Sequence, residues 1–242
     1  MKIKGVKLFS TILVSGLLSG GCVMNKLNEA HETIQLKQIA EGLPISVDIA
    51  KGGHWSKRMQ AGPVVFNVLP QIVIWAEDKE GRFLGTLYIT GADYKTFRHG
   101  GKSEKGAAFW AECFPVWAAR LKTVNGTLPS KENPYTDAVT SATPMSSFTL
   151  KTNLPPDKPA FLYLEVNQSG DTNATYTDQN NDWAGQPSLI YRADISQMQP
   201  GSACKMSLAG HGGRIKDQPD IYPDVSSLDT ALDQIQEITV SF

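Results

Sequence analysis

Apolar and polar side chains alternate in several short segments along the chain. In the first of them, Ile45, Val47 and Ile49 are separated by Ser46, Asp48 and Ala50. A period of two is typical of a β-strand that buries one face. The same alternation returns at residues 148–151, 162–167, 189–195 and 238–242. Loops rich in Gly, Pro, Asn and Asp separate most of these segments, so the pattern predicts a protein built mainly of strands.

Residues 71–90 carry the strongest strand signal. The apolar, β-branched run from Gln71 to Ala76 and a second run from Arg82 to Thr90 flank the turn sequence Asp78-Lys79-Glu80-Gly81. Two such runs joined by a short glycine-containing turn predict a β-hairpin. Strict alternation in the second run would place Phe83, Gly85, Leu87 and Ile89 on one face and Thr86, Tyr88 and Thr90 on the other.

An aromatic segment from Ala107 to Leu121 interrupts the series of strands. Pro115 prevents one continuous helix here, so we expect a short helix on either side of it or an irregular segment. Its large side chains would cover an open sheet edge or one end of a sandwich, or line a ligand cleft. The fold class predicted is all-β: an antiparallel, immunoglobulin-like β-sandwich with a short aromatic helical or irregular covering segment.

Between Gln71 and Arg192 the chain resembles a bacterial family of predicted periplasmic proteins of unknown function. The resemblance rests on a strand Ile-Trp-Ala-Glu-Asp, a strand Thr-Leu-Tyr-Ile-Thr, Pro115-Val116-Trp117, a stretch Asp-Ala-Val-Thr-Ser-Ala-Thr-Pro, and Leu-Glu-Val-Asn before a closing strand. It implies an exported β-sandwich and no particular activity.

The first residues have the pattern of an export signal. Lys2, Lys4 and Lys7 precede an apolar run that is too short to span a membrane. The following Leu18-Ser19-Gly20-Gly21-Cys22 resembles the lipobox of bacterial lipoproteins, which implies cleavage after residue 21 and lipidation of Cys22. Ordinary secretion with a chance cysteine is the alternative. We therefore expect a signal peptide at 1–21, a lipid anchor and tether with a frayed helix at 22–42, and a single β-sandwich domain at 43–242. Val23 is not the aspartate that retains such lipoproteins at the inner membrane, so the resemblance favours an outer membrane location facing the periplasm.

Composition argues against nucleic acid as a partner. Loss of residues 1–21 would remove three lysines and no acidic residue, which leaves 20 basic against 24 acidic side chains. No run of more than two adjacent basic residues occurs.

Two cysteines follow Cys22 in the sequence. In an oxidising compartment Cys113 and Cys204 would form a disulfide, or they would be two separate buried thiols; the sequence favours neither alternative. No CxxC motif is present.

One short motif points to a cofactor. Asp137-Ala138-Val139-Thr140-Ser141-Ala142-Thr143 is similar to the Asp-x-x-(Ser/Thr)-Gly-Ala-(Thr/Ser) sequence at which exported flavin transferases attach FMN. The resemblance implies a covalent FMN on Thr143, with Asp137, Thr140 and Ser141 shaping the loop. The alternative is a turn in which these side chains bond to the backbone.

An oxygen-rich loop is a candidate cation site. Asp171, Asn173, Asp178 and Asp182 lie close together in the sequence, and such side chains are ligands that Ca²⁺ prefers. An ordinary solvated loop is the alternative. The neighbouring Trp183 offers a surface for stacking on a sugar ring, or a structural anchor.

No catalytic constellation is recognisable. His54, His99 and His211 are dispersed, and no Gly-x-Ser-x-Gly motif occurs. We therefore expect a non-enzymatic, lipid-anchored, periplasm-facing module that binds or supports an envelope protein partner. The alternatives are an electron carrier with FMN on Thr143 and a carbohydrate- or Ca²⁺-dependent surface binding module.

Overall fold

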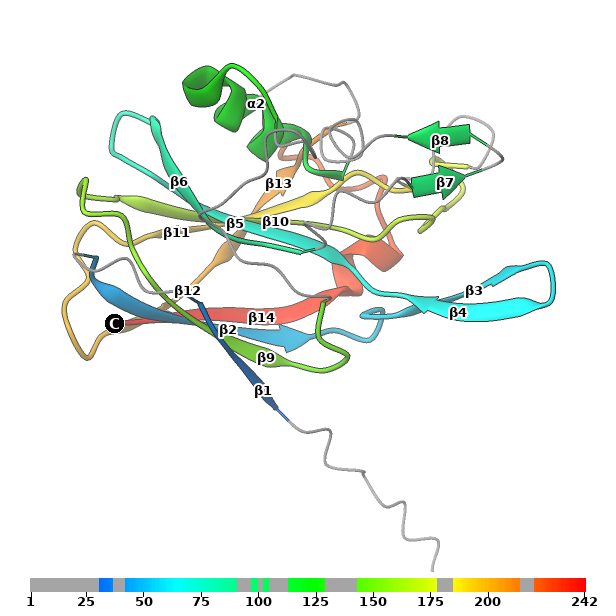
Figure 1. The fold of residues 1–242 in the computed structure, drawn as a ribbon, viewed down its shortest axis with the longest axis horizontal. Coiled ribbons are helices and arrows are strands. Elements are labelled where there is room, and N and C mark those ends of the chain that lie inside the picture. The colour runs from blue at the N-terminus through cyan, green and yellow to red at the C-terminus, as the bar shows by residue number, and fades with distance from the viewer. Residues whose placement is uncertain are drawn as a thin grey trace, which may run out of the picture.

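A computed structural model describes residues 31–36, 42–90, 97–99, 102–104, 113–128, 143–177, 185–213 and 220–242. Its strands form two five-stranded sheets stacked face to face (Figure 1). The first sheet has the order β1 (Glu32–Gln35), β9 (Phe148–Asn153), β2 (Pro44–Lys51), β14 (Ile235–Ser241) and β12 (Ala203–Lys205). The second has the order β13 (Ser207–His211), β11 (Leu189–Asp194), β10 (Phe161–Asn167), β5 (Gln71–Glu77) and β6 (Phe83–Ile89). The predicted all-β sandwich is confirmed.

Four smaller elements complete the described part of the chain. They are the hairpin β3 (Lys57–Ala61) with β4 (Val64–Val68), the hairpin β7 (Phe97–His99) with β8 (Lys102–Glu104), the helix α2 (Pro115–Asn125) and the 3₁₀ helix η1 (Thr230–Asp233). The two hairpins belong to neither large sheet. Every strand pair is antiparallel except β1 with β9, which is parallel.

The core between the sheets follows the predicted alternation. Ile45, Val47 and Ile49 of β2 are buried, and so are Leu162 and Leu164 of β10. Together with apolar side chains of β5, β9 and β14 they form one cluster between the two sheets. Removal of this apolar surface from water is the main stabilising contribution to the fold.

The central strands β5 and β10 of the second sheet are buried on both faces. Val73 and Trp75 of β5 point away from the first sheet and pack in a second apolar cluster with Phe114 and Trp117. Figure 1 shows α2 lying over this outer face. The aromatic segment therefore covers a sheet face, whereas the sequence predicted a cover for an edge or an end. Burial on both faces explains why β5 is a continuous apolar run rather than an alternating one.

Pro115 begins the helix. It occupies the first turn of α2, where its missing N–H costs no helical hydrogen bond, and Phe114 just before it is non-helical. Gly126 ends the helix with a φ of 70°, and its N–H donates to the carbonyl of Lys122.

Two predictions about local structure were wrong. Residues 32–35, which were assigned to a tether with a frayed helix, form β1 at the edge of the first sheet, so the sandwich includes residues before 43. In β6, strict alternation fails because the pairing with β5 contains two register shifts, each of which leaves one residue of β6 without a partner in the ladder. As a result Leu87 packs with Tyr88 in the core between the sheets, while Phe83 and Ile89 pack in the cluster beneath α2.

Candidate functional site

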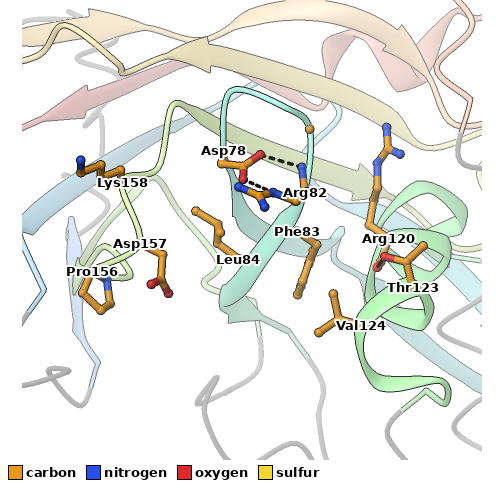
Figure 2. Close-up of a pocket in the computed structure, with 11 residues that line it drawn as sticks. Asp78, Arg82, Phe83, Leu84, Arg120, Thr123, Val124, Pro156, Asp157 and Lys158 are labelled. Carbon is orange, nitrogen blue, oxygen red and sulfur yellow. Dashed lines mark hydrogen bonds and ion pairs between the residues drawn. The ribbon is translucent and has the colours of Figure 1, made fainter.

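A groove of about 850 Å³ lies at the β6 edge of the second sheet (Figure 2). Three segments line it: the turn between β5 and β6 with the start of β6, the second half of α2, and the turn between β9 and β10. The lining residues are Asp78, Gly81, Arg82, Phe83, Leu84, Arg120, Thr123, Val124, Pro156, Asp157 and Lys158. In Figure 2 β6 crosses the groove, with α2 on one side and residues 156–158 on the other.

β6 is an edge strand of the second sheet in the part of the chain that the structure describes. Within the described residues, β6 pairs only with β5 and ends the sheet order. An edge strand presents N–H and C=O groups that can bond to another extended chain. Phe83 and Leu84 both contribute side chains to the groove at the start of this strand. The start of β6 therefore combines apolar side chains with backbone hydrogen-bonding capacity.

The turn that leads into β6 is held by one aspartate. Asp78 Oδ1 accepts hydrogen bonds from the backbone N–H groups of Glu80 (3.0 Å) and Arg82 (2.9 Å), and the Arg82 side chain donates from Nε to Asp78 Oδ2. Desolvation raises the pKa of Asp78, but the hydrogen bonds and the charge of Arg82 outweigh it, so the pKa is below its ordinary value. Gly81 has a φ of 76°, which glycine adopts without strain. The rim is therefore a fixed turn with an ionised carboxylate.

Arg120 joins the groove to the interior. Its Nε lies 3.2 Å from Oε1 of the buried Glu77, which also accepts a hydrogen bond of 2.9 Å from Trp75 Nε1. Burial raises the pKa of Glu77, while the bond from Trp75 and the charge of Arg120 oppose that rise. Trp75 stacks on Tyr163 with ring centroids 5.1 Å apart, and the guanidinium of Arg192 lies over the ring of Phe161. The ion pair of Arg120 with Glu77 joins the helix side of the groove to the sheet, and the aromatic contacts join neighbouring strands beneath it.

The start of α2 is fixed by a carboxyl group from the sheet. Glu165 of β10 is fully buried and accepts hydrogen bonds from the backbone N–H of Trp117 (2.9 Å) and from the Ser188 hydroxyl (2.6 Å). A longer bond comes from the N–H of Val116 (3.4 Å). The residue before the helix supplies no side-chain cap, so Glu165 satisfies the amide groups at the helix start. Burial raises the pKa of Glu165 to about 8 against the effect of these three bonds.

The groove has the chemistry of a binding surface. The groove has four apolar side chains, which are those of Phe83, Leu84, Val124 and Pro156. Both carboxylate and cationic side chains surround them. Among the lining residues there is no cysteine, serine or histidine. In the described ranges no three His, Cys, Asp or Glu side chains are grouped as metal ligands.

Thr143, the residue proposed to carry FMN, is buried. Its hydroxyl donates a hydrogen bond of 2.5 Å to the carbonyl of Pro70, just before β5. Pro144 follows Thr143 in the chain, and its carbonyl accepts a hydrogen bond of 2.8 Å from Trp55 Nε1. The hydroxyl therefore connects this segment to the sandwich. Asp137, Thr140 and Ser141 lie outside the described residues, as does Cys22.

Two of the four proposed calcium ligands belong to a polar network. Asp171 is buried; its carboxylate accepts hydrogen bonds from Thr230 Oγ1 and Gln186 Nε2 and lies 3.6 Å from Lys57 Nζ. Asn173 uses its amide group in bonds to Gln186 and to the backbone of Ser227, Thr175 and Tyr176. Their oxygens thus already have partners: those of Asp171 bond to Thr230 of η1, and that of Asn173 bonds within its own loop. Asp178, Asp182 and Trp183 fall in a range that the structure does not describe.

No disulfide bond joins Cys113 and Cys204, which are both described. Cys113 is buried in the cluster beneath α2, and Cys204 of β12 packs against the cluster between the sheets. Of the two alternatives left open by the sequence, the structure has two separate thiols.

The sequence did not identify the groove residues Arg120 and Lys158 or the buried Glu165. Lys158 has a φ of 56° in the turn between β9 and β10. Glu165 was expected on the polar face of its strand, and nothing local indicated that a helix would cover that face. The one available signal was Pro115 at the start of an aromatic segment, since proline is frequent in the first turn of a helix.

Comparison with protein-family models, with curated proteins and with solved structures found no match. The resemblance to a periplasmic family stays a prediction from the sequence. Of the helices in the described ranges, none has the length and apolarity that crossing a membrane requires.

Proposed function

We propose that this protein is a lipid-anchored, periplasm-facing module of the cell envelope that binds an extended segment of a partner protein along β6. The observation that carries the proposal is the groove of about 850 Å³ at the edge strand of the second sheet. The anchor is supported by the basic and apolar residues before Cys22.

An extended peptide suits this groove better than a compact ligand. A segment added beside β6 would bond to the strand through its backbone and place alternate side chains against α2 and against residues 156–158. Phe83 and Val124 offer apolar contacts on the helix side, and Leu84 and Pro156 offer them on the other. Asp157 and Lys158 provide charges of both signs for selecting the sequence of the partner.

The anchor is tested by intact mass and by membrane fractionation. We expect the protein from a bacterial envelope to lack residues 1–21 and to carry acyl chains on Cys22, because the apolar run ends at a lipobox-like sequence. The variant Cys22→Ala should lack the acyl mass and should no longer yield the mature membrane-bound form. Wild-type protein with an unmodified Cys22 in the soluble fraction would contradict the anchor.

The groove is tested by photo-crosslinking in the envelope. A photoreactive residue replaces Val124, whose side chain is 60% exposed in the groove, and the matched control replaces Met145, which is 63% exposed and outside it. We expect one defined adduct from position 124 and none from position 145. The substitution Leu84→Asp should abolish the adduct, because it places a charge on the apolar side of the groove.

Equal labelling at positions 124 and 145 would contradict the groove as a binding site. An adduct that persists with Leu84→Asp would place the partner on α2 rather than along β6. Thermal unfolding of each variant is the control for an intact fold.

A further inference from the structure

The hairpin β3–β4 extends away from the sandwich (Figure 1). Its second strand exposes three consecutive apolar side chains: Val64 is 59% exposed, Val65 is 46% and Phe66 is 43%. In the described residues neither β3 nor β4 pairs with any other strand. A two-stranded ribbon is marginal in water by itself, and grouped exposed apolar side chains mark interaction surfaces.

The hairpin is amphipathic. Met59 pairs with Phe66, and Val64 lies two residues before Phe66, so these three apolar side chains share one face. Gln60 pairs with Val65 and Arg58 with Asn67, so the opposite face is mainly polar. The exposed Val64 and Phe66 thus form an apolar surface directed to one side of the ribbon.

The sandwich holds the hairpin at its base. Lys57 Nζ donates to the carbonyl of Gly170 (2.5 Å), and the Met59 side chain packs so closely over Gly170 that a Cβ there would lie 3.0 Å from Met59 Cε. Farther along, residues 62–67 are all exposed. The ribbon is therefore a fixed projection with an uncovered end.

The hairpin leaves the sandwich at the end where the N-terminal segment enters. Glu32, the first residue of β1, pairs with Phe148, and Phe148 pairs with Ile49 near the end of β2. β2 ends at Lys51, and the hairpin begins six residues later, at Lys57. The chain that leads to Cys22 and the base of the hairpin are therefore at one end of the first sheet.

We propose that the apolar face of this hairpin docks on the surface of the lipid bilayer. The inference rests on the proposed lipid anchor. Nine residues separate Cys22 from Glu32, a stretch that spans at most about 35 Å, so the sandwich end with the hairpin stays close to the membrane.

The charge and the length of the hairpin are compatible with contact with a lipid bilayer. From 57 to 68 the hairpin contains no acidic residue, and the exposed Arg58 on its polar face would favour anionic headgroups, while Lys57 already bonds to Gly170 at the base. Five-residue strands extend about 17 Å, which places Val64 near the end of the ribbon and Phe66, the partner of Met59, halfway along it. A ribbon lying with its apolar face on the bilayer would bring both side chains to the acyl boundary while the sandwich stays in water. The hairpin would give the sandwich a second membrane contact and so fix the direction in which the groove faces.

The test measures how close position 66 comes to lipid acyl chains. Full-length protein with Phe66→Trp, expressed with its own N-terminal segment, is mixed with vesicles of phosphatidylethanolamine and phosphatidylglycerol, with and without bromine on the acyl chains. The matched control is Leu208→Trp in β13, where the replaced side chain is 39% exposed. The signal is tryptophan fluorescence emission, and the emission of the parent protein is subtracted from that of each variant.

We expect bromine to lower the added emission about twofold at position 66, because an interfacial side chain lies about 5–10 Å into the headgroup boundary, and to leave position 208 unchanged. Unquenched emission at position 66 overturns the inference, and so does a lipid-independent spectral shift that grows with protein concentration, which indicates a second copy. Intact mass of the same sample reports the acyl chains on Cys22 separately. An acylated protein without quenching would retain the proposed anchor and reject the hairpin contact.

Discussion

The free energy of unfolding is expected to fall as the pH rises from about 4.5 to about 8, and Glu165→Gln is expected to remove most of this fall. The buried carboxyl of Glu165 has a pKa of about 8 in the folded protein, above its ordinary value of 4.5. Between these values the folded state holds a proton that the unfolded state releases. Stability is therefore greatest at the acidic end of this range and decreases by up to about 1.4 kcal/mol per pH unit.

Denaturant titrations of both proteins at several pH values from 5 to 8 measure this slope. Gln retains the shape of the neutral acid, so the variant keeps a buried polar group without the titration. The matched control Glu237→Gln changes an exposed carboxyl on β14 and should retain the wild-type slope. Equal slopes for wild type and Glu165→Gln would show that another group controls the pH dependence.

Replacement of Trp75 by Ala is expected to lower the free energy of unfolding by about 3–5 kcal/mol. The side chain is fully buried, stacks on Tyr163 and donates to Glu77, so the substitution leaves a cavity and removes a hydrogen bond from a buried carboxyl. For a domain of this size the loss corresponds to a decrease in Tm of about 6–20 °C.

Circular dichroism during thermal unfolding measures this change. Val124→Ala is the control, because Val124 is 60% exposed and its truncation should change stability by less than about 0.5 kcal/mol. A Trp75 variant that unfolds within a few degrees of the wild type would mean that the cluster beneath α2 contributes little to the cooperative fold.

The strands were predictable where the local run of apolar and polar residues matches the burial of the strand, on one face for β2 and on both faces for β5. The alternation of Ile45, Val47 and Ile49 located β2, and the run from Gln71 to Ala76 with the turn after it located β5 and β6. In these segments the local pattern of apolar residues and the burial in the fold agree. The all-β class follows from the number of such segments.

The candidate site was not predictable, because it depends on contacts between distant segments. Glu165 looked like an outward-facing residue, and only the packing of α2 from fifty residues earlier buries it. The register shifts in β6 change which face of the sheet Leu87 occupies. No single residue in the strand indicates where these shifts occur. The groove itself combines two turns, the start of β6 and a helix, which meet only after the sheet has formed.

The edge strand β1 is the described strand that lies nearest in sequence to the proposed anchor at Cys22. If the proposed lipid anchor at Cys22 holds the protein on a membrane, a pull on it would reach β1 before any other described strand, because β1 is the first of them in the chain. β1 is four residues long and pairs only with β9, whereas β2 lies between β9 and β14. Under tension β1 would detach first, and the chain before Pro44 would lengthen while the sandwich stays intact. Detachment of this strand would limit the force that reaches the rest of the domain.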